Sequence, residues 1–518
     1  MTGNQIQILI TMSVYLIGIV MIGVFYAKRA NKNSDYYFLG DRGLGPWVTA
    51  MSAEASDMSG WLLMGLPGVA YWMGIADAAW TAIGLALGTY INWLIVSKRL
   101  RRYSVKVKSI TIPEFFSNRF HEKSGVILAV SALFILVFFT VYAASCLVTC
   151  GKLFSTLFGT PYVVMMIVGA VFVLVYTFLG GFLAESVSDF IQAFVMITVL
   201  IITLAVGVFA AGGFGQIIEN CRNIPGFLEF FSIATPTVSD AGTQIIENGS
   251  PVFGEAAKYS ALSVFSALAW GLGYFGMPQV LLRFMAISEE NKLKVSRRIA
   301  VIWCVISLAV SVFIGIIGRT LYPTELLTQA QSENIFILMS ERLLPPLIAG
   351  LSMAGILAAT MSSSDSYLLI ASSAAAKDIY KRIFRKNAEE KQIMLISRVS
   401  LVVITLIAIV IALDENSRIF SIVSFAWAGF GATFGPLMLF SLFWKRTNFY
   451  GAVAGMLGGG ISVFVWKLAI KPLGGVFAIY ELLPAFIISS ILIIIVSLVT
   501  EKPSEEIETE FEEVKKGI

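Results

Sequence analysis

Long apolar stretches separated by short polar segments run through almost the whole chain. A helix needs about 20 predominantly apolar residues to cross the ~30 Å hydrocarbon core of a bilayer. By that measure the sequence predicts thirteen membrane-spanning helices, and hence an all-α polytopic membrane protein. The predicted spans are residues 5–26, 45–74, 76–97, 125–150, 160–180, 188–211, 259–284, 299–321, 334–376, 396–413, 419–444, 449–470 and 480–499.

The second predicted span is interrupted between Ala53 and Gly68, AEASDMSGWLLMGLPG, where an apolar run carries two carboxylates, two serines, three glycines and a proline. In hydrocarbon each unsatisfied backbone group costs several kcal/mol, so a broken helix is tolerated only where protein buries it or where it lines a wet cavity. We expect the glycines and the proline between Gly60 and Gly68 to open this helix. The carbonyl oxygens freed by the opening are ligands for a hard cation.

A second interrupted span follows five crossings later, at Trp270–Pro278, WGLGYFGMP. Two broken helices in corresponding positions predict an inverted-repeat transporter with its site near the bilayer midplane. Predicted helices 2–6 (about 45–211) and 7–11 (about 259–444) then form two inverted five-helix repeats with broken first helices, and helices 1, 12 and 13 are additions. The transmembrane transporter domain covers residues 1–500.

Composition agrees with this class, since 57% of the 518 residues are hydrophobic and only 14% are charged. If the amino terminus lies outside, 29 of the 37 Lys and Arg residues fall in inside segments, which predicts an external amino terminus and a cytoplasmic carboxyl terminus. The inside segments are residues 28–42, 98–123, 283–298, 377–398, 445–446 and the tail. We therefore expect a multi-pass protein of the cell membrane, without a cleavable signal peptide.

The tail, residues 501–518, is acidic and is expected to be a solvated cytoplasmic segment without a stable fold. The four cysteines are too scattered for a metal or disulfide framework, and the single histidine, His121, lies in a basic segment. No Ser/His/Asp set, metal-ligand cluster or phosphate loop is recognisable, so neither an enzyme nor a nucleic-acid partner is expected. A channel would need a continuous polar path, whereas the polar groups cluster at one depth.

A polar stretch, Ala358–Ser366 (AATMSSSDS), lies in the middle of the long ninth span. Four serines, one threonine and an aspartate are costly there unless they face a cavity or an ion. The alternative is a close helix contact, because small residues let transmembrane backbones approach each other. The broken helix at residues 53–68 favours the ion site.

A third polar stretch, Ala184–Gln192 (AESVSDFIQ), opens the sixth span. Glu185 is expected in a short inner loop and Asp189 one turn deeper. Asp189 has two roles that stay open: capping the helix or pairing with a basic residue, and assisting the exit of an ion. Tyr142, one aromatic residue among many, would by itself be assigned to packing.

Four motifs together resemble one family, the solute:sodium symporters, and within it the branch that transports proline. They are FLGDRGLGPWVTAMSAEASDMSGWLLMGLPG, GGFLAESVSDFIQA, WGLGYFGMPQVLLRFMA and GILAATMSSSDSYLLIASSA, in order from about Asp35 to beyond Trp444. The resemblance implies Na⁺-coupled uptake of L-proline by alternating access, in a bilayer-embedded functional monomer. The alternative is a Na⁺ symporter of another small organic solute, such as pantothenate, a sugar or a betaine-like compatible solute.

The resemblance also implies a Na⁺ site, whose ligands would be the carbonyls of Ala55, Met58 and Ala359 and the hydroxyls of Ser362 and Ser363. Their spacings, i and i+3 in the second span and i, i+3 and i+4 in the ninth, predict one helical face for each set. All-oxygen ligation suits Na⁺. Asp57 matches the family's acid beside the site, and Asp189 would lie near it.

The proline pocket that the resemblance implies comprises Ser59, Gly60, Tyr142, Trp270, Tyr274 and Pro278. Trp270, Tyr274 and Pro278 are spaced i, i+4 and i+8, which predicts one face of a helix. An aromatic wall suits a compact ring that carries a secondary ammonium. Arg42 matches a family arginine expected to act as a gate or coupling residue.

The sequence departs from the family pattern at three positions. Ser363 stands where some members have threonine, which keeps the hydroxyl group. Glu54 adds a second carboxylate three residues before Asp57, and Asp365 adds another after the serines. These two acids leave open an altered ion preference or a contribution of protons.

Overall fold

The computed structural model describes residues 2–30 and 34–517, most of them in helices. The first half contains α1 (Gly3–Ala30), α2 (Ser34–Leu39), η1 (Gly40–Arg42), α3 (Pro46–Asp57), η2 (Trp61–Gly65), α4 (Leu66–Met73), α5 (Ile75–Ile91), η3 (Asn92–Val96), α6 (Ser97–Lys106), α7 (Ile112–Arg119), α8 (Val126–Phe158), α9 (Tyr162–Ala210) and α10 (Phe214–Arg222). The second half contains α11 (Ala261–Leu268), η4 (Ala269–Phe275), α12 (Pro278–Ala286), η5 (Glu290–Lys292), α13 (Leu293–Leu321), η6 (Gln331–Asn334), α14 (Ile335–Leu343), α15 (Pro346–Ser373), η7 (Ala374–Phe384), α16 (Glu390–Ile411), α17 (Ile419–Phe443), α18 (Phe449–Val465), η8 (Trp466–Ile470), η9 (Lys471–Leu473), η10 (Gly475–Phe477), α19 (Leu482–Val499) and α20 (Glu505–Lys516).

Ten helices of the described residues are long and apolar enough to cross a membrane, or up to eleven if the bent pair Ala261–Phe275 and Pro278–Ala286 is one span. Two further predicted spans correspond to shorter apolar helices, Trp61–Met73 and Tyr162–Phe178. They are short because the chain breaks near Met58 and again at Gly181, where φ is 60°. A polytopic helical protein is therefore confirmed, while the count of thirteen stays a prediction.

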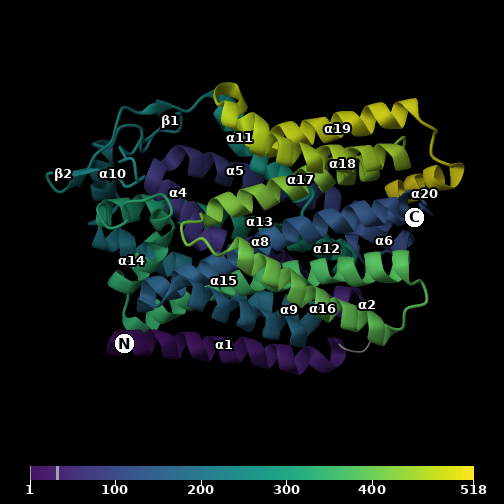
Figure 1. Ribbon diagram of the computed structural model, residues 1–518, viewed down its shortest axis with the longest axis horizontal. Coiled ribbons are helices and arrows are strands. Elements are labelled where there is room, and N and C mark those ends of the chain that lie inside the picture. Colours follow the sequence, from purple (N-terminus) through teal and green to yellow (C-terminus); the bar gives the residue numbers. More distant parts are fainter. Residues whose placement is uncertain (1, 31–33, 518) are drawn as a thin grey trace.

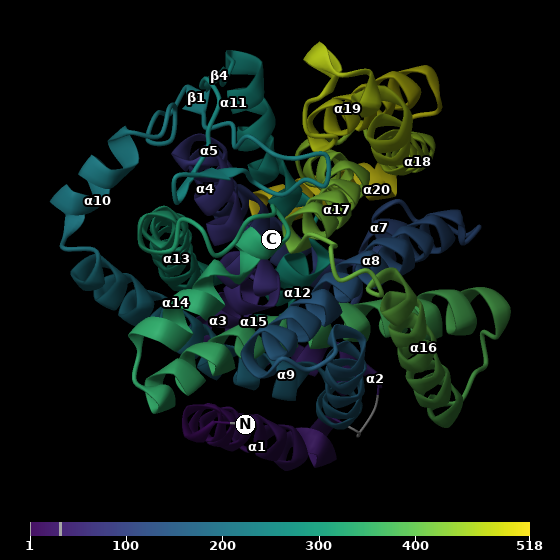
Figure 2. The same ribbon diagram turned by 60° about the vertical axis from the view of Figure 1, so that its left-hand side comes forward.

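The long helices run side by side along the longest axis of the molecule (Figure 1). α15 lies in the centre of the bundle, where it packs extensively on both α8 and α9 and also contacts α3. α1 lies on one flank against α9 and α15, and the α18–α19 pair lies on the opposite flank against α17 (Figure 2). Predicted helices 1, 12 and 13 correspond to α1, α18 and α19, which lie at the periphery. The repeat boundaries themselves stay a prediction.

The two ends of the helix bundle differ in character. One end carries α6, α7, η7 and α20, which are linked by ion pairs such as Lys106–Glu513 and Arg382–Glu114, and we call it the basic end. The other end carries α10 and two short antiparallel ladders, β1 (Ser232–Ile233) with β4 (Ala257–Lys258) and β2 (Ile246–Glu247) with β3 (Ser250–Pro251).

The first broken helix opens earlier than its glycines predict. α3 ends at Asp57, Met58 leaves the helical conformation (φ −87°, ψ 64°), and the chain becomes helical again from Gly60 onward through the π-turn η2 into α4. The expectation that the later glycines open the helix is therefore wrong. Gly68 serves a close approach instead, because a Cβ atom there would lie 2.8 Å from the Cα of Glu333.

In the second broken helix the chain passes from the α-helix α11 into a 3₁₀ helix before the break. η4 is a 3₁₀ helix that ends at Phe275, and α12 begins at Pro278, a first-turn position where the missing N–H costs nothing. The two parts are bent by 41°. A 3₁₀ helix has three residues per turn, so the prediction of a single helical face for Trp270, Tyr274 and Pro278 is wrong.

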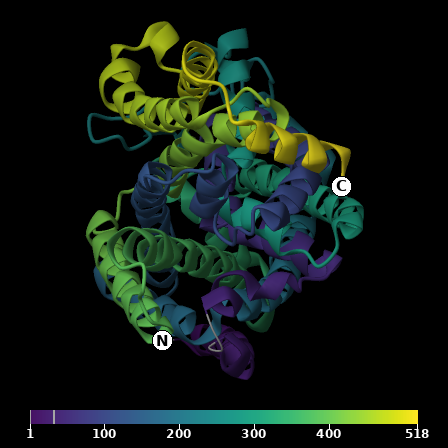
Figure 3. The same cartoon turned by 90° about the vertical axis from the view of Figure 1, so that its right-hand side faces the viewer.

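The carboxyl-terminal segment is a docked helix, and the expectation that it lacks a stable fold is wrong. In α20 the side chains of Ile507, Phe511 and Val514 are buried, because their spacing forms an apolar stripe on one face. Charged contacts fix the rest of α20: Glu513 pairs with Lys106 at 2.5 Å, and Glu510 contacts His121 at 2.9 Å. Figure 3 shows α20 lying across the basic end.

Candidate ion and substrate site

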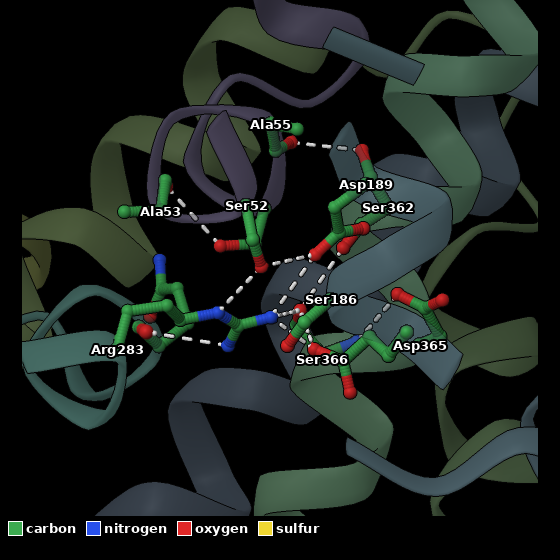
Figure 4. Close-up of polar contacts among 12 residues, drawn as sticks. Ser52, Ala53, Ala55, Ser186, Asp189, Arg283, Ser362, Asp365 and Ser366 are labelled. Carbon is green, nitrogen blue, oxygen red and sulfur yellow. Dashed lines mark hydrogen bonds and ion pairs between the residues drawn. The ribbon is translucent and has the colours of Figure 1, made fainter. Parts of the chain in front are cut away.

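The break after α3 leaves the carbonyl of Ala55 without its helical partner. The backbone N–H of Ser59, which would bond this carbonyl in a continuous helix, donates to the Asp57 carbonyl at 3.1 Å. Two side chains of α15 take its place: the hydroxyl of Ser362 donates to Ala55 O at 2.8 Å (Figure 4), and the hydroxyl of Ser363 donates to it at 3.4 Å. A carbonyl and two hydroxyls therefore converge between α3 and α15.

The structure brings together four of the five predicted Na⁺ ligands. The Ser362 hydroxyl also lies 3.2 Å from the carbonyl of Ala359, and α15 is helical throughout, so Ala359, Ser362 and Ser363 share one face as predicted. Met58 is the exception. It lies beyond the end of α3 and leaves the helical conformation, so the prediction that it shares a helical face with Ala55 is wrong.

Asp57 is a buried carboxylate at the end of α3, with 4% of its surface exposed. Its Oδ1 accepts a hydrogen bond from Gln279 at 3.3 Å, and Tyr142 donates to its backbone carbonyl at 3.5 Å. Among the described residues, no basic side chain forms an ion pair with Asp57. A buried anion without a basic partner is costly, and a bound cation would remove that cost.

One helical turn from the serines, a completely buried arginine joins three helices. The guanidinium of Arg283, on α12, forms ion pairs with Glu185 and, at 3.1 Å, with Asp189, both on α9. It also donates to the hydroxyls of Ser52 on α3 at 3.0 Å and Ser366 on α15 at 2.9 Å. Figure 4 shows these groups converging on the guanidinium, so Arg283 ties both broken helices to α9 and α15.

This cluster corrects two predictions. Glu185 is not in a loop, because α9 continues as a helix after Gly181 and carries Glu185 into the bundle, 4% exposed. Arg283 is not an inside-loop residue, because it is buried in α12. For Asp189, of the two open roles, the structure shows pairing with a basic residue and a hydrogen bond from Ser52 at 2.7 Å.

Asp365 adds a third carboxylate beside this cluster. Its Oδ1 accepts from the backbone N–H of Ser366 at 2.8 Å, while its Oδ2, like Oδ1 of Asp189, has no hydrogen-bond partner among the described residues. Three buried acids thus lie around one guanidinium. Carboxyl groups therefore outnumber basic groups in this cluster.

Trp270 and Tyr274, the residues of the predicted aromatic wall, lie among other aromatic rings. Trp270 has four ring neighbours, with centroid distances of 5.0 Å to Tyr480, 5.2 Å to Phe420, 5.5 Å to Trp61 and 6.2 Å to Trp427. Tyr274 meets the same Trp427 edge-on at 5.0 Å. Trp427 approaches this closely because residue 273 is glycine, where a Cβ atom would lie 1.9 Å from the indole nitrogen.

The other predicted pocket residues lie at the two breaks. Ser59 accepts a hydrogen bond from the backbone N–H of Trp61 at 3.3 Å, and Gly60 packs directly against Thr149 of α8. Tyr142, also on α8, stacks on Tyr367 of α15 at 4.2 Å. Tyr142 thus reaches the first break, while Pro278 starts α12 after the second.

Arg42, the predicted gate residue, lies at the basic end and not at the break. Its guanidinium donates to the Met285 carbonyl at 2.6 Å, the Ser109 carbonyl at 2.5 Å and the Ser104 hydroxyl at 3.0 Å. It therefore clamps the end of α12 to α6 and the following turn. Burial, followed by the nearby Arg101, lowers the pKa of Arg42 to about 10, so the side chain is charged at neutral pH.

Sequence reasoning missed Arg283 as a site residue and the rings of Phe420, Trp427 and Tyr480. For Arg283 a signal exists, because a single basic residue in the apolar run VLLRFMA requires a buried partner. For the rings none exists, since aromatic residues are frequent throughout the chain and only the fold selects these three.

Two solved structures share the fold of this chain. A Na⁺-coupled sialic acid symporter, solved in its substrate-bound outward-open state, superposes with a TM-score of 0.75 over 96% of this chain and 99% of its own, at 18% sequence identity. MhsT in complex with L-phenylalanine superposes with a TM-score of 0.52 over 87% of this chain and 97% of its own, at 16% identity.

The sequence defines the family more narrowly. The profile of the Sodium:solute symporter family matches residues 37–459, and the chain belongs to that family. The sodium/proline symporter of Escherichia coli (strain K12) is 41% identical, over 98% of this chain and 95% of its own length. The osmoregulated proline transporter OpuE of Bacillus subtilis (strain 168) is 40% identical, over 97% and 96%.

Proposed function

We propose that this chain couples the inward movement of Na⁺ to the uptake of L-proline by alternating access. One observation carries the ion coupling: the freed carbonyl of Ala55 faces the hydroxyls of Ser362 and Ser363, beside the unpaired carboxylate of Asp57. Oxygen ligands next to a buried negative charge suit Na⁺. The names of the full-length relatives, each near 40% identical, support proline as the solute.

Na⁺ is bound between α3 and α15 in this proposal. Its ligands are the carbonyls of Ala55, Met58 and Ala359 and the hydroxyls of Ser362 and Ser363. When Na⁺ enters, these two hydroxyls turn their lone pairs toward it and release the Ala55 carbonyl. Asp57 and Asp189 supply negative potential near the ion.

Proline binds between the two breaks, against Trp270 and Tyr274, with Ser59, Gly60, Tyr142 and Pro278 completing the pocket. A ring face attracts the secondary ammonium with ~0.5 to 2 kcal/mol. Trp270, Phe420 and Tyr480 also line a cavity of about 510 Å³ at the end opposite the basic end. We assign this cavity to proline entry, with the aromatic cluster closed beneath it in this conformation.

The remaining architecture is part of the same proposal. The chain crosses the cell membrane thirteen times as a functional monomer, with the amino terminus outside and the basic end in the cytoplasm. Two inverted repeats, about 45–211 and 259–444, rock around the central site, and Arg42 acts on the gate at the basic end. Residues 501–518 then lie on the cytoplasmic surface.

Counterflow of radiolabelled proline in proteoliposomes tests this function. Unlabelled proline should compete, while pantothenate, sugars and betaines should not, and uptake should follow an inward Na⁺ gradient. Competition by one of those solutes in place of proline would transfer the function to the alternative substrate. Uptake driven equally by a proton gradient in Na⁺-free buffer would contradict Na⁺ coupling.

A further inference from the structure

A cavity of about 600 Å³ lies at the basic end, between α7, the start of α8 and η7. We call it the basic-end vestibule. Basic side chains, among them Lys377 and Arg382, make up much of its lining. Exposed side chains such as Lys123 and Lys386 form its rim, whereas Glu114 and Asp378 are buried at its floor.

The two floor carboxylates differ in their partners. Glu114 is fully engaged, because it forms an ion pair with Arg382 and accepts from the backbone N–H of Ile110 at 2.8 Å. Asp378, with 1% of its surface exposed, has one hydrogen bond: Oδ1 accepts from the hydroxyl of Thr111 at 3.0 Å. Its Oδ2 has no partner among the described residues.

A second, much smaller cavity of about 10 Å³ begins where the vestibule ends, and Ile110 and Asp378 line both. Ser373 lines the small cavity as well; its side chain is 5% exposed, and its hydroxyl has no partner among the described residues. η7 is a π-helix that starts directly after Ser373. Since a π-helix bonds residue i to i+5, Asp378 lies about one turn from Ser373 on the same side.

We propose that Asp378, Ser373 and Thr111 form a transient Na⁺ site at the floor of the basic-end vestibule, through which the ion leaves the protein. Three oxygen-bearing side chains, among them a carboxylate whose Oδ2 has no partner among the described residues, border a space the size of one water molecule. This set suits a small hard cation. Proline is too large for the space, so the site takes the ion alone.

The position of the site supports an exit role. Leu369 lines both the small cavity and a further cavity bounded by Glu185 and Asp365, the acids beside Arg283. The three cavities thus form a series from the central charge cluster to the vestibule. The basic residues of the rim, together with Lys377 and Arg382 beside Asp378, weaken cation binding there, which favours release over retention.

This inference rests on the proposed Na⁺ coupling. Membrane vesicles of both orientations distinguish a failure of the exit site from a failure of the coupling itself. The half-saturating Na⁺ concentration for proline transport is measured in right-side-out and inside-out membrane vesicles that contain the full chain. Asp378→Asn keeps the hydrogen bond from Thr111 and removes the charge. We expect it to raise the half-saturating Na⁺ concentration about tenfold at the basic end, and less than twofold at the opposite end.

Three further variants test whether Asp378 and Ser373 form the proposed site. Ser373→Ala should shift the same basic-end value in the same direction by a smaller factor, and Asp378→Glu should restore most of it. Asp240→Asn, in an exposed turn at the opposite end, is the matched control and should change neither value. Equal shifts at both faces, or a lower maximal rate without any shift, would overturn the proposed site. Wild-type transport that needs no Na⁺ would instead refute the coupling itself.

Discussion

Both broken helices interrupt the backbone inside an apolar span, but the side chains around the two breaks differ. The first break, after Asp57, faces oxygen: the hydroxyls of Ser362 and Ser363 reach the freed Ala55 carbonyl. The second break, before Pro278, follows a segment packed among aromatic rings, with Trp270 in contact with four of them. The first break therefore suits a desolvated cation, which needs oxygen ligands. The second suits a compact ring, which needs an aromatic surface.

Arg283 is the strongest test of whether the two breaks act together, because it lies on α12 and reaches Ser52 on α3. Arg283→Met would leave Glu185 and Asp189 buried and unpaired, and removing one partner of a buried ion pair costs ~3 to 5 kcal/mol. We expect a much lower unfolding midpoint in detergent. An unchanged midpoint would show that another group neutralises these acids.

The same variant has a rescue that separates charge from packing. Adding Glu185→Gln and Asp189→Asn to Arg283→Met removes all three charges together. The triple variant should regain a large part of the lost stability, whereas a purely steric defect would persist.

At the first break, Asp57→Asn should produce the next largest effect. A hydrogen bond or ion contact to a charged group contributes ~1.5 to 3 kcal/mol, so the Na⁺ requirement for proline uptake should rise about ten- to hundredfold. Initial uptake rates measured against Na⁺ concentration give this value. An unaltered Na⁺ dependence would make Asp57 a structural residue.

At the second break, Trp270→Ala and Tyr274→Ala remove aromatic surface and leave the oxygen ligands in place. Proline affinity should fall about 2- to 30-fold for Trp270→Ala, and the loss should persist at saturating Na⁺. Phe209→Ala, which alters an exposed apolar side chain far from the site in sequence, serves as a control. A defect that high Na⁺ abolishes would place Trp270 with the ion.

The smallest expected effects distinguish the two serines. Ser362→Ala deletes the closer hydroxyl, at 2.8 Å from Ala55 O, and Ser363→Ala the farther one, at 3.4 Å. Each should raise the Na⁺ requirement about 2- to 10-fold, with the larger shift for Ser362, and proline binding should recover at high Na⁺. Because linkage is reciprocal, proline titrations at several Na⁺ concentrations must show the same coupling factor. A proline defect that persists would place the cation elsewhere.

The sequence was most informative where apolar residues form long runs, or where a polar group inside an apolar span carries a high energetic cost. Long apolar runs predicted the helical bundle, and the serines of α15 predicted oxygen facing the first break, because polar groups at that depth require a partner. The exact break was not predictable, since Gly68 is required by the close approach of Glu333, a contact between distant segments. Pairing of Glu185 with Arg283 was missed for the same reason, as 98 positions separate the two residues.

Docking of α20 has a consequence for the order of assembly. Arg119 is fully buried, and its guanidinium lies over the rings of Tyr103 and Phe120, both at 5.1 Å, and of Phe511 in α20, at 5.5 Å. The membrane-spanning helices found between Gly3 and Val499 are all synthesised before Phe511. Tyr103 and Phe120 are therefore available to Arg119 before Phe511 is, and the ring contact with Phe511 forms only when α20 docks.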